Sequence, residues 1–90
     1  TVAITDNQNV FFTIFPNPSQ GQFTVNVYSE TSETGVVKMY DMSGKLIMNR
    51  NMPLVQGNNS LQVENVLRSG VYLIEVITSA GRSTKRLIIE

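Results

Sequence analysis

The sequence predicts an all-β fold, an immunoglobulin-like antiparallel β-sandwich of about seven strands, on three observations. Short apolar segments recur along the chain, separated by turn residues at intervals of about 8–12 residues. Residues 22–29 alternate between polar and apolar side chains, which is typical of a strand with one buried face. No segment has a convincing helical period over about ten residues or more.

The most apolar segment, residues 71–77, predicts a strand in the middle of a sheet with cover on both faces. Only Glu75 interrupts its apolar character. We expect Gly70 to adopt a positive φ before this strand, and the Tyr72 hydroxyl to bond to upstream backbone. Because side chains alternate along a strand, the two faces would carry Val71, Leu73 and Ile77, and Tyr72, Ile74 and Val76.

The first third of the chain predicts a linker and two strands. Residues 1–10 carry three amides, one acid and no apolar period, so we expect a linker or a loosely held terminus. Residues 11–15 are a short apolar strand. The run Pro16-Asn17-Pro18-Ser19-Gln20-Gly21 ends it in a rigid turn, because proline fixes φ and removes a backbone donor. In residues 22–29, the inward side chains would be Phe23, Val25 and Val27.

The middle of the chain predicts a hairpin. Residues 30–35 are polar and turn-like, and residues 36–40 form the first strand. Asp41 and Gly44 occupy the first and fourth positions of a type I turn, as that turn prefers. Residues 45–52 return as the partner strand, although an isoleucine within them leaves the register open. The side chains expected to point inward are Val37, Met39, Leu46 and Met48.

The last third predicts three strands, the first of them residues 59–64 with Leu61 and Val63 buried. Residues 53–58 are expected to form a loop, and residues 65–70 a corner that places Leu67 beneath the core. The strand around Tyr72 follows, and residues 78–81 turn the chain. Residues 82–90 are the last strand, with Leu87 and Ile89 inside and Lys85 on the same row nearer the rim.

The composition predicts a single domain without a reaction centre. The chain has 90 residues, and its seven acidic and seven basic residues balance. No charge excess therefore attracts it to nucleic acid. It contains no cysteine and no histidine, so the commonest general bases and nucleophiles are missing. We expect no catalytic residue, no cofactor and no metal site.

The acidic residues are better explained by structure than by chemistry. Calcium requires several converging oxygens, and Asp41 is the only acid in its turn. Paired carboxylates for glycoside hydrolysis could be sought among Asp41, Glu64 and Glu75, but a small sandwich with short loops offers no obvious cleft. The basic residues Arg82 and Lys85, with the adjacent Arg86, have two open interpretations. They either keep a terminal strand from pairing with other chains or form a docking surface.

Four motifs, in order, cover residues 12–90. They are Phe15-Pro16-Asn17-Pro18 with Gly21 and Phe23; Val37-Lys38-Met39-Tyr40-Asp41-Met42-Ser43-Gly44-Lys45; Leu67-x-x-Gly70-Val71-Tyr72-x-Ile74-x-Val76; and Gly81 with Lys85-Arg86-Leu87-Ile88-Ile89. Together they resemble the type IX secretion system C-terminal sorting domain, type A, also described as the Por secretion system C-terminal domain. The motif residues expected to be mainly structural are Pro16, Asn17, Pro18, Gly21, Asp41, Gly44, Gly70 and Tyr72.

The resemblance implies a non-catalytic secretion signal at the C-terminus of a cargo protein from certain Gram-negative bacteria. A signal peptide takes such a protein to the periplasm, where an outer-membrane translocon and its shuttle protein recognise the folded domain. A sortase-like cysteine protease commonly cuts the preceding linker, and the cargo is attached to lipopolysaccharide or released. Residues 1–10 would be the linker from the upstream cargo, and residues 11–90 the sorting domain.

We expect the last strand to be part of what the export machinery recognises. It ends the sequence, it mixes basic and apolar residues, and an exposed sheet edge is a natural surface for strand addition. The candidate recognition residues are Lys85, Arg86, Leu87, Ile88, Ile89 and Glu90.

Two other functions stay open from the sequence. A generic immunoglobulin-like or fibronectin-like module could serve adhesion or spacing in a secreted multidomain protein. A carbohydrate-binding module would need an exposed aromatic platform, for which we expect only Tyr28 and Tyr40 to be available. Free edge strands would also permit a weak homodimer.

Overall fold

The computed structural model describes residues 10–64 and 68–90, which form seven strands and no helix. The all-β prediction is confirmed. No helix in the described part of the chain is long and apolar enough to cross a membrane. The strands are β1 (Phe11–Phe15), β2 (Gln22–Ser29), β3 (Glu33–Asp41), β4 (Leu46–Leu54), β5 (Gly57–Glu64), β6 (Gly70–Thr78) and β7 (Gly81–Ile89).

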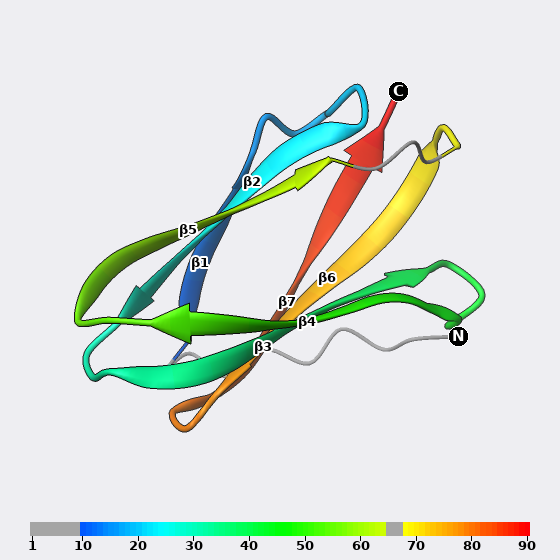
Figure 1. The fold of residues 1–90 in the computed structure, drawn as a ribbon. Coiled ribbons are helices and arrows are strands. Elements are labelled where there is room, and N and C mark those ends of the chain that lie inside the picture. Colours follow the sequence, from blue (N-terminus) through cyan, green and yellow to red (C-terminus); the bar gives the residue numbers. More distant parts are fainter. Residues whose placement is uncertain (1–9, 65–67) are drawn as a thin grey trace.

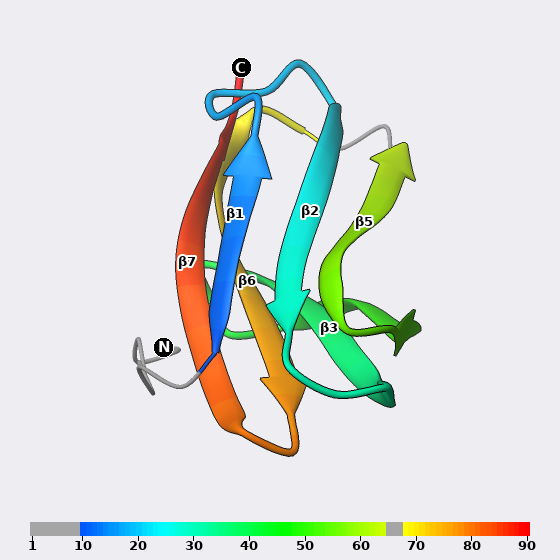
Figure 2. The ribbon, with the colours of Figure 1, turned by 90° about the vertical axis from the view of Figure 1, so that its left-hand side faces the viewer.

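Two antiparallel sheets pack face to face as a β-sandwich (Figure 1). One sheet has the order β1-β2-β5, and the other has the order β4-β3-β6-β7. Figure 2 shows β1 and β7 side by side, running in the same direction toward the C-terminal end. The beginning of β1 and the end of β7 therefore lie at opposite ends of the molecule.

The core between the sheets is built from alternate residues of the strands, as the sequence predicts. Phe23, Val25 and Val27 of β2 are at most 3% exposed, and the predicted Leu61 is only partly buried against them. Val10, which the sequence placed in the linker, is 5% exposed and belongs to the core. The buried core residues that the sequence did not single out are Val10, Phe12, Met52 and Leu54. The predicted placement of Leu67 lies outside the described residues.

Strand β6 lies in the middle of its sheet, between β3 and β7, as predicted. Its inward side chains, Tyr72, Ile74 and Val76, are all buried. The expected cover on the outer face is wrong, because no third layer of described residues packs there. Leu73 is nevertheless only 2% exposed, since Tyr40 and Arg86 lie opposite it on the two neighbouring strands.

The corner before β6 is fixed by Tyr72 rather than by Gly70. The Tyr72 hydroxyl donates to the Arg68 carbonyl at 2.7 Å, as the sequence predicts. The positive φ predicted for Gly70 is wrong, since this residue is the first of β6 and pairs with Ile89. A Cβ at Gly70 would approach no closer than 3.8 Å to Tyr72. The described residues with positive φ are Gly21, Gly44, Gly57 and Gly81.

The β3–β4 hairpin differs from prediction at both of its ends. Strand β3 begins at Glu33 and therefore includes Gly35. A Cβ at Gly35 would come within 3.0 Å of Leu54 Cδ1, so the close packing there favours glycine. Strand β4 continues through Pro53 to Leu54, so the predicted loop at 53–58 is confined to residues 55–56. Proline is tolerated in β4 because β4 is an edge strand.

A β-bulge explains the wrong prediction for Leu46. Met39 pairs with Met48, but Tyr40 pairs with Leu46, so Ile47 is an extra residue opposite the step between Met39 and Tyr40. The bulge interrupts the alternation of side chains along β4. Met48 is therefore inside as predicted, whereas Leu46 is 45% exposed and Ile47 packs partly against the core.

Two carboxylates anchor the turns. The carboxylate of Asp41 accepts hydrogen bonds from the Ser43 hydroxyl and from the Ser43 and Lys45 amides, which lowers its pKa. The Gly44 amide also donates to the Asp41 carbonyl at 3.1 Å, as expected for the predicted turn. Glu33 accepts from the amide of Ser79 at 2.8 Å and from its hydroxyl at 2.7 Å, and these bonds lower the pKa of Glu33. Glu33 thereby ties β3 to the β6–β7 turn.

Removing the Tyr72 hydroxyl should destabilise the domain by a small amount, which can be measured separately from the loss of the ring. We expect Tyr72→Phe to lower the free energy of unfolding by about 1 kcal/mol, because the ring stays buried while the bond to Arg68 is lost. Tyr72→Ala should cost about 3–5 kcal/mol, a large share of the roughly 5–13 kcal/mol expected for a domain of this size. Urea unfolding measures both, with Tyr28→Phe as an exposed control. Equal stability of wild type and Tyr72→Phe would contradict the role of the corner.

The domain should lose stability in acid. The pKa values of Glu33 and Asp41 lie below their ordinary values of 4.5 and 3.8, so the unfolded chain binds more protons than the folded one. The stabilisation is complete above those ordinary values and is lost as the pH falls through the folded values. Urea unfolding between neutral pH and about pH 3 should show this loss, and Glu33→Gln should reduce the slope. A slope unchanged by Glu33→Gln but reduced by the control Glu30→Gln would contradict this account.

Candidate functional site

The predicted recognition residues occupy the second half of β7, and the alternation of the strand divides them. Leu87 and Ile89 are 0% and 3% exposed, so they belong to the core and are not accessible to a partner. Arg86 and Ile88 point to the outer face of the four-stranded sheet, and Ile88 is 39% exposed. Glu90 follows the strand and is exposed.

Lys85 lies on the inward row, at the rim of the sandwich, as predicted. Its side chain is exposed, and its Nζ atom lies 5.5 Å from the centre of the Phe12 ring. A cation at this distance from an aromatic face is attracted by the electrons of the ring. Lys85 therefore links β7 to β1 of the other sheet.

The outer edge of β7 is closed by the Asn17 side chain. The Asn17 Nδ2 donates to the Arg86 carbonyl at 2.8 Å, and the Ile88 amide donates to Asn17 Oδ1 at 3.0 Å. A primary amide presents a donor and an acceptor side by side, much as a peptide group does. Asn17 thus takes the place of a neighbouring strand, while the prolines on either side of it have no backbone donor of their own.

Ser19 continues this closure with its backbone. Its amide donates to the Ile88 carbonyl at 2.7 Å, and its carbonyl accepts from the Glu90 amide at 2.8 Å. The Ser19 side chain is 1% exposed and fixes the turn by donating to the Gln22 carbonyl and accepting from the Gly21 amide. The role of Ser19 was not predicted from the sequence, where the only indication of it is the position of Ser19 directly after the Pro-Asn-Pro run.

The closed edge corrects one expectation. The sequence suggested that β7 is an exposed edge suited to strand addition. Four hydrogen bonds from Asn17 and Ser19 already occupy the backbone groups from Arg86 to Glu90. A partner that recognises this part of the strand therefore meets side chains and not free backbone.

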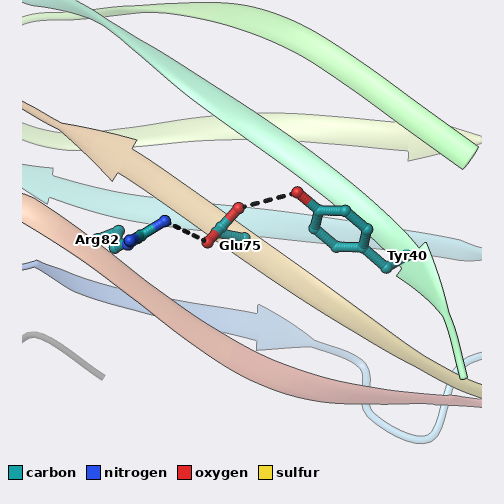
Figure 3. A network of polar contacts seen from close by, with 3 residues as sticks. All are labelled: Tyr40, Glu75 and Arg82. Atoms are coloured by element: carbon teal, nitrogen blue, oxygen red, sulfur yellow. Dashed lines mark hydrogen bonds and ion pairs between the residues drawn. The ribbon is translucent and has the colours of Figure 1, made fainter. Parts of the chain in front are cut away.

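The predicted basic edge is divided between two sides of β7. Lys85 faces Phe12, whereas Arg82 and Arg86 lie on the outer face of the four-stranded sheet. Arg82 Nη1 lies 3.8 Å from Glu75 Oε2 on β6 (Figure 3). The three cations therefore do not form one cluster. Arg82 and Arg86 share the outer face of the sheet, and Lys85 lies on the other side of β7.

Glu75 is held in the centre of the sheet by partners on both sides. The Tyr40 hydroxyl of β3 donates to Glu75 Oε1 at 3.1 Å, opposite the contact with Arg82 (Figure 3). Burial raises the pKa of the Tyr40 hydroxyl, and the hydrogen bond and negative charge of Glu75 raise it further. These two partners explain how the most apolar strand tolerates a carboxylate whose side chain is 12% exposed.

The family-motif residues lie at the β1–β2 turn, at the start of β6 and at the β3–β4 turn. The turn of Pro16, Asn17, Pro18 and Gly21 covers the end of β7, where Gly70 pairs with Ile89. One row across the four-stranded sheet joins Asp41 to Tyr72 and Tyr72 to Leu87. Gly44 completes the turn that follows Asp41. Motifs that are far apart in sequence are thus joined across neighbouring strands.

A groove of about 720 Å³ lies beside the β1–β2 turn. Its walls include Pro16, Pro18, Gln22, Glu64 and Glu90. Among residues 10–64 and 68–90, no group of three acidic side chains is placed to hold a metal ion. The groove therefore combines apolar proline rings with amides and two carboxylates.

The comparisons with known proteins give one result. A family model described as a secretion system C-terminal sorting domain matches residues 13–90. Neither the curated proteins nor the solved structures give a significant match. The match begins inside β1 and includes the Pro-Asn-Pro turn, the β3–β4 and β6–β7 hairpins and the closed edge of β7. The chain therefore belongs to the family of type IX secretion C-terminal sorting domains.

Proposed function

We propose that this domain is a removable, non-catalytic tag that its export machinery recognises at the outward side chains of β7. Membership of the family makes the domain a sorting signal for a secreted cargo that ends at the cell surface or outside the cell. We also propose the route by which the cargo is exported. The cargo waits in the periplasm, the outer-membrane translocon and its shuttle protein bind the folded domain, and a sortase-like cysteine protease cuts residues 1–10.

The observation that carries this proposal is the fixed backbone that presents Arg86 and Ile88 outward, with Lys85 and Glu90 exposed beside them. The bonds of Asn17 and Ser19 hold the backbone of this segment, and the burial of Leu87 and Ile89 fixes its rotation. A backbone that is already held in one conformation loses less conformational entropy when a partner binds. The backbone of this segment is therefore preorganised for recognition.

The family role also supports a domain without catalysis. Its members act as sorting signals, and the carboxylates of Asp41 and Glu33 are engaged in turns. The generic adhesion or spacer function finds no specific support in the contacts of this domain.

Deleting residues 85–90 from a reporter fused to this domain should abolish export, because the deletion removes the outward side chains. The deletion also frees Asn17 and Ser19 from their partners, so a second variant is needed. Asn17→Ala removes two hydrogen bonds from the same edge but keeps every side chain of β7. We expect it to lower the free energy of unfolding by about 1–2 kcal/mol.

The deletion also removes Leu87 and Ile89 from the core, so circular dichroism must first show that each variant folds; export of the folded variants then distinguishes recognition from stability. Surface proteolysis and cell fractionation measure export in a host with the secretion system. Asn17→Ala should be exported at a substantial fraction of the wild-type level, whereas the deletion should remain in the periplasm. Normal export of the deleted fusion would overturn the proposed recognition by β7. Loss of export in Asn17→Ala, together with retained folding, would assign recognition to the turn.

Cleavage should occur before the folded domain. Residues 1–10 precede β1, and the strand-paired backbone of β2 to β7 is a poor substrate for a protease. Mass spectrometry of the exported cargo should find its new C-terminus at or before residue 10. A new C-terminus within residues 22–90 would contradict removal of the intact domain.

A further inference from the structure

We infer that the outward face of the three-stranded sheet binds a neutral glycan chain. We call this surface the three-strand face, and it comprises the outward side chains of β1, β2 and β5, which lie side by side in Figure 2. It lies on the opposite side of the sandwich from the outer face of the four-stranded sheet. The inference goes beyond the proposed function and does not depend on it, because the two involve different sheets.

The exposed aromatic rings of the domain all lie on the three-strand face. Of four phenylalanines and three tyrosines, all within the described residues, the exposed ones are Phe11, Phe15 and Tyr28, at 62%, 49% and 47%. Phe11 pairs with Tyr28 across β1 and β2, and Phe15 follows four residues later, about 13 Å along β1. The electron-rich face of such a ring attracts the C–H groups of a sugar ring. Tyr40, which the sequence also suggested for an aromatic platform, lies in the other sheet and bonds to Glu75.

Hydroxyls and amides occupy the rows between the rings, without a charged group. The central row crosses the sheet from Thr13 to Asn26 to Ser60, and Asn26 Nδ2 donates to Ser60 Oγ at 3.4 Å. The next row pairs Thr24 with Gln62. Primary amides and hydroxyls both donate and accept hydrogen bonds, as the hydroxyl groups of a sugar do. The three-strand face therefore offers rings for the apolar sides of a sugar and polar groups for its hydroxyls.

One end of the three-strand face is hollowed by the groove of about 720 Å³ beside the β1–β2 turn. Four outward residues of the face line this groove, Gln22, Thr24, Gln62 and Glu64, together with Glu90. Binding sites for small molecules have volumes of about 300–1,000 Å³, so the groove has room for part of a glycan chain. A carboxylate accepts hydrogen bonds from neighbouring hydroxyls but repels an acidic sugar. The two carboxylates at this end therefore favour a neutral glycan.

The three-strand face is too small for a standard protein interface. Three strands about 4.8 Å apart, the longest of them eight residues, give a footprint of roughly 14 by 27 Å, or about 380 Å². Each partner in a standard interface buries about 800 Å². A second copy of this chain would also press the polar row of Thr13, Asn26 and Ser60 against itself, whereas homodimer interfaces are mostly apolar. A single glycan chain laid over the strands fits both the width and the polarity of the face.

The experiment measures binding of the purified full chain to soluble polysaccharides by affinity gel electrophoresis. The neutral probes are dextran, mannan, galactomannan, xyloglucan and hydroxyethylcellulose, and the anionic probes are polygalacturonate and carboxymethylcellulose. We expect a neutral probe to retard the protein more strongly than either anionic probe does. Retardation by no neutral probe, or stronger retardation by an anionic one, would overturn the inference.

Removing two of the rings should weaken this binding. We expect Phe15→Ala with Tyr28→Ala to raise the dissociation constant about tenfold or more, because two ring contacts are lost. The matched control, Met42→Ala with Leu46→Ala, removes two exposed apolar side chains from the β3–β4 hairpin and should bind as the wild type does. Equal weakening in both variants, or no weakening in the test variant, would overturn the inference.

A single position covers the case in which the double substitution prevents folding. Tyr28→Ala removes one ring and Tyr28→Phe keeps it, and circular dichroism should show both variants folded because Tyr28 is exposed. We expect Tyr28→Ala to raise the dissociation constant about threefold or more relative to Tyr28→Phe, through the lost ring contact. Equal affinity of these two variants would overturn the inference.

Two further measurements test a protein as the occupant. We expect the purified wild-type domain to be monomeric in sedimentation equilibrium. We also expect a reporter fusion that carries Phe15→Ala with Tyr28→Ala to be exported as the wild-type fusion is, since the side chains of β7 are unchanged. Self-association that the double substitution abolishes would replace the glycan with a second copy of the chain. Loss of export with unchanged glycan binding would replace it with a protein of the export machinery.

Discussion

Four hydrogen bonds between the turn at Asn17 and Ser19 and the backbone of β7 constrain the rest of the structure. The turn joins β1 to β2 in the three-stranded sheet, whereas β7 is the edge of the other sheet. These bonds therefore hold the two sheets together along one side, where hydrophobic contact alone would leave an open edge. They join residues about seventy positions apart, so they can form only when the whole chain is folded.

The closed edge determines how β7 can be used. With its backbone paired on both sides near the C-terminal end, the strand offers a partner only its outward side chains. Leu87 and Ile89 fill the core, while Arg86 and Ile88 are displayed on the opposite face. The Tyr40, Glu75 and Arg82 contacts extend that displayed surface inward across β6 and β3. Because side chains alternate along a strand, β7 contributes one set of side chains to the core and the other set to the accessible surface.

The sequence was sufficient for the fold class, for most inward residues and for the Tyr72 corner, because each depends on local patterns. Alternation in residues 22–29 and the position of one tyrosine are visible in a single strand. The bulge at Ile47 could not be predicted, because it depends on the register between β3 and β4. The role of Asn17 was also hidden, since its partners Arg86 and Ile88 are remote in sequence. Recognition by β7 stays a prediction for its exposed residues, whereas burial removes Leu87 and Ile89 from any contact surface.

The opposite placement of the start of β1 and the end of β7 separates two tasks in space (Figure 2). Whatever precedes residue 10 is attached at the far pole from Glu90. In the proposed function, a cargo joined ahead of β1 is therefore attached to the sandwich at the end remote from Glu90. Under that proposal, cargo proteins of different size and shape could use the same sorting domain, because the linker and the recognition residues lie at opposite ends of it.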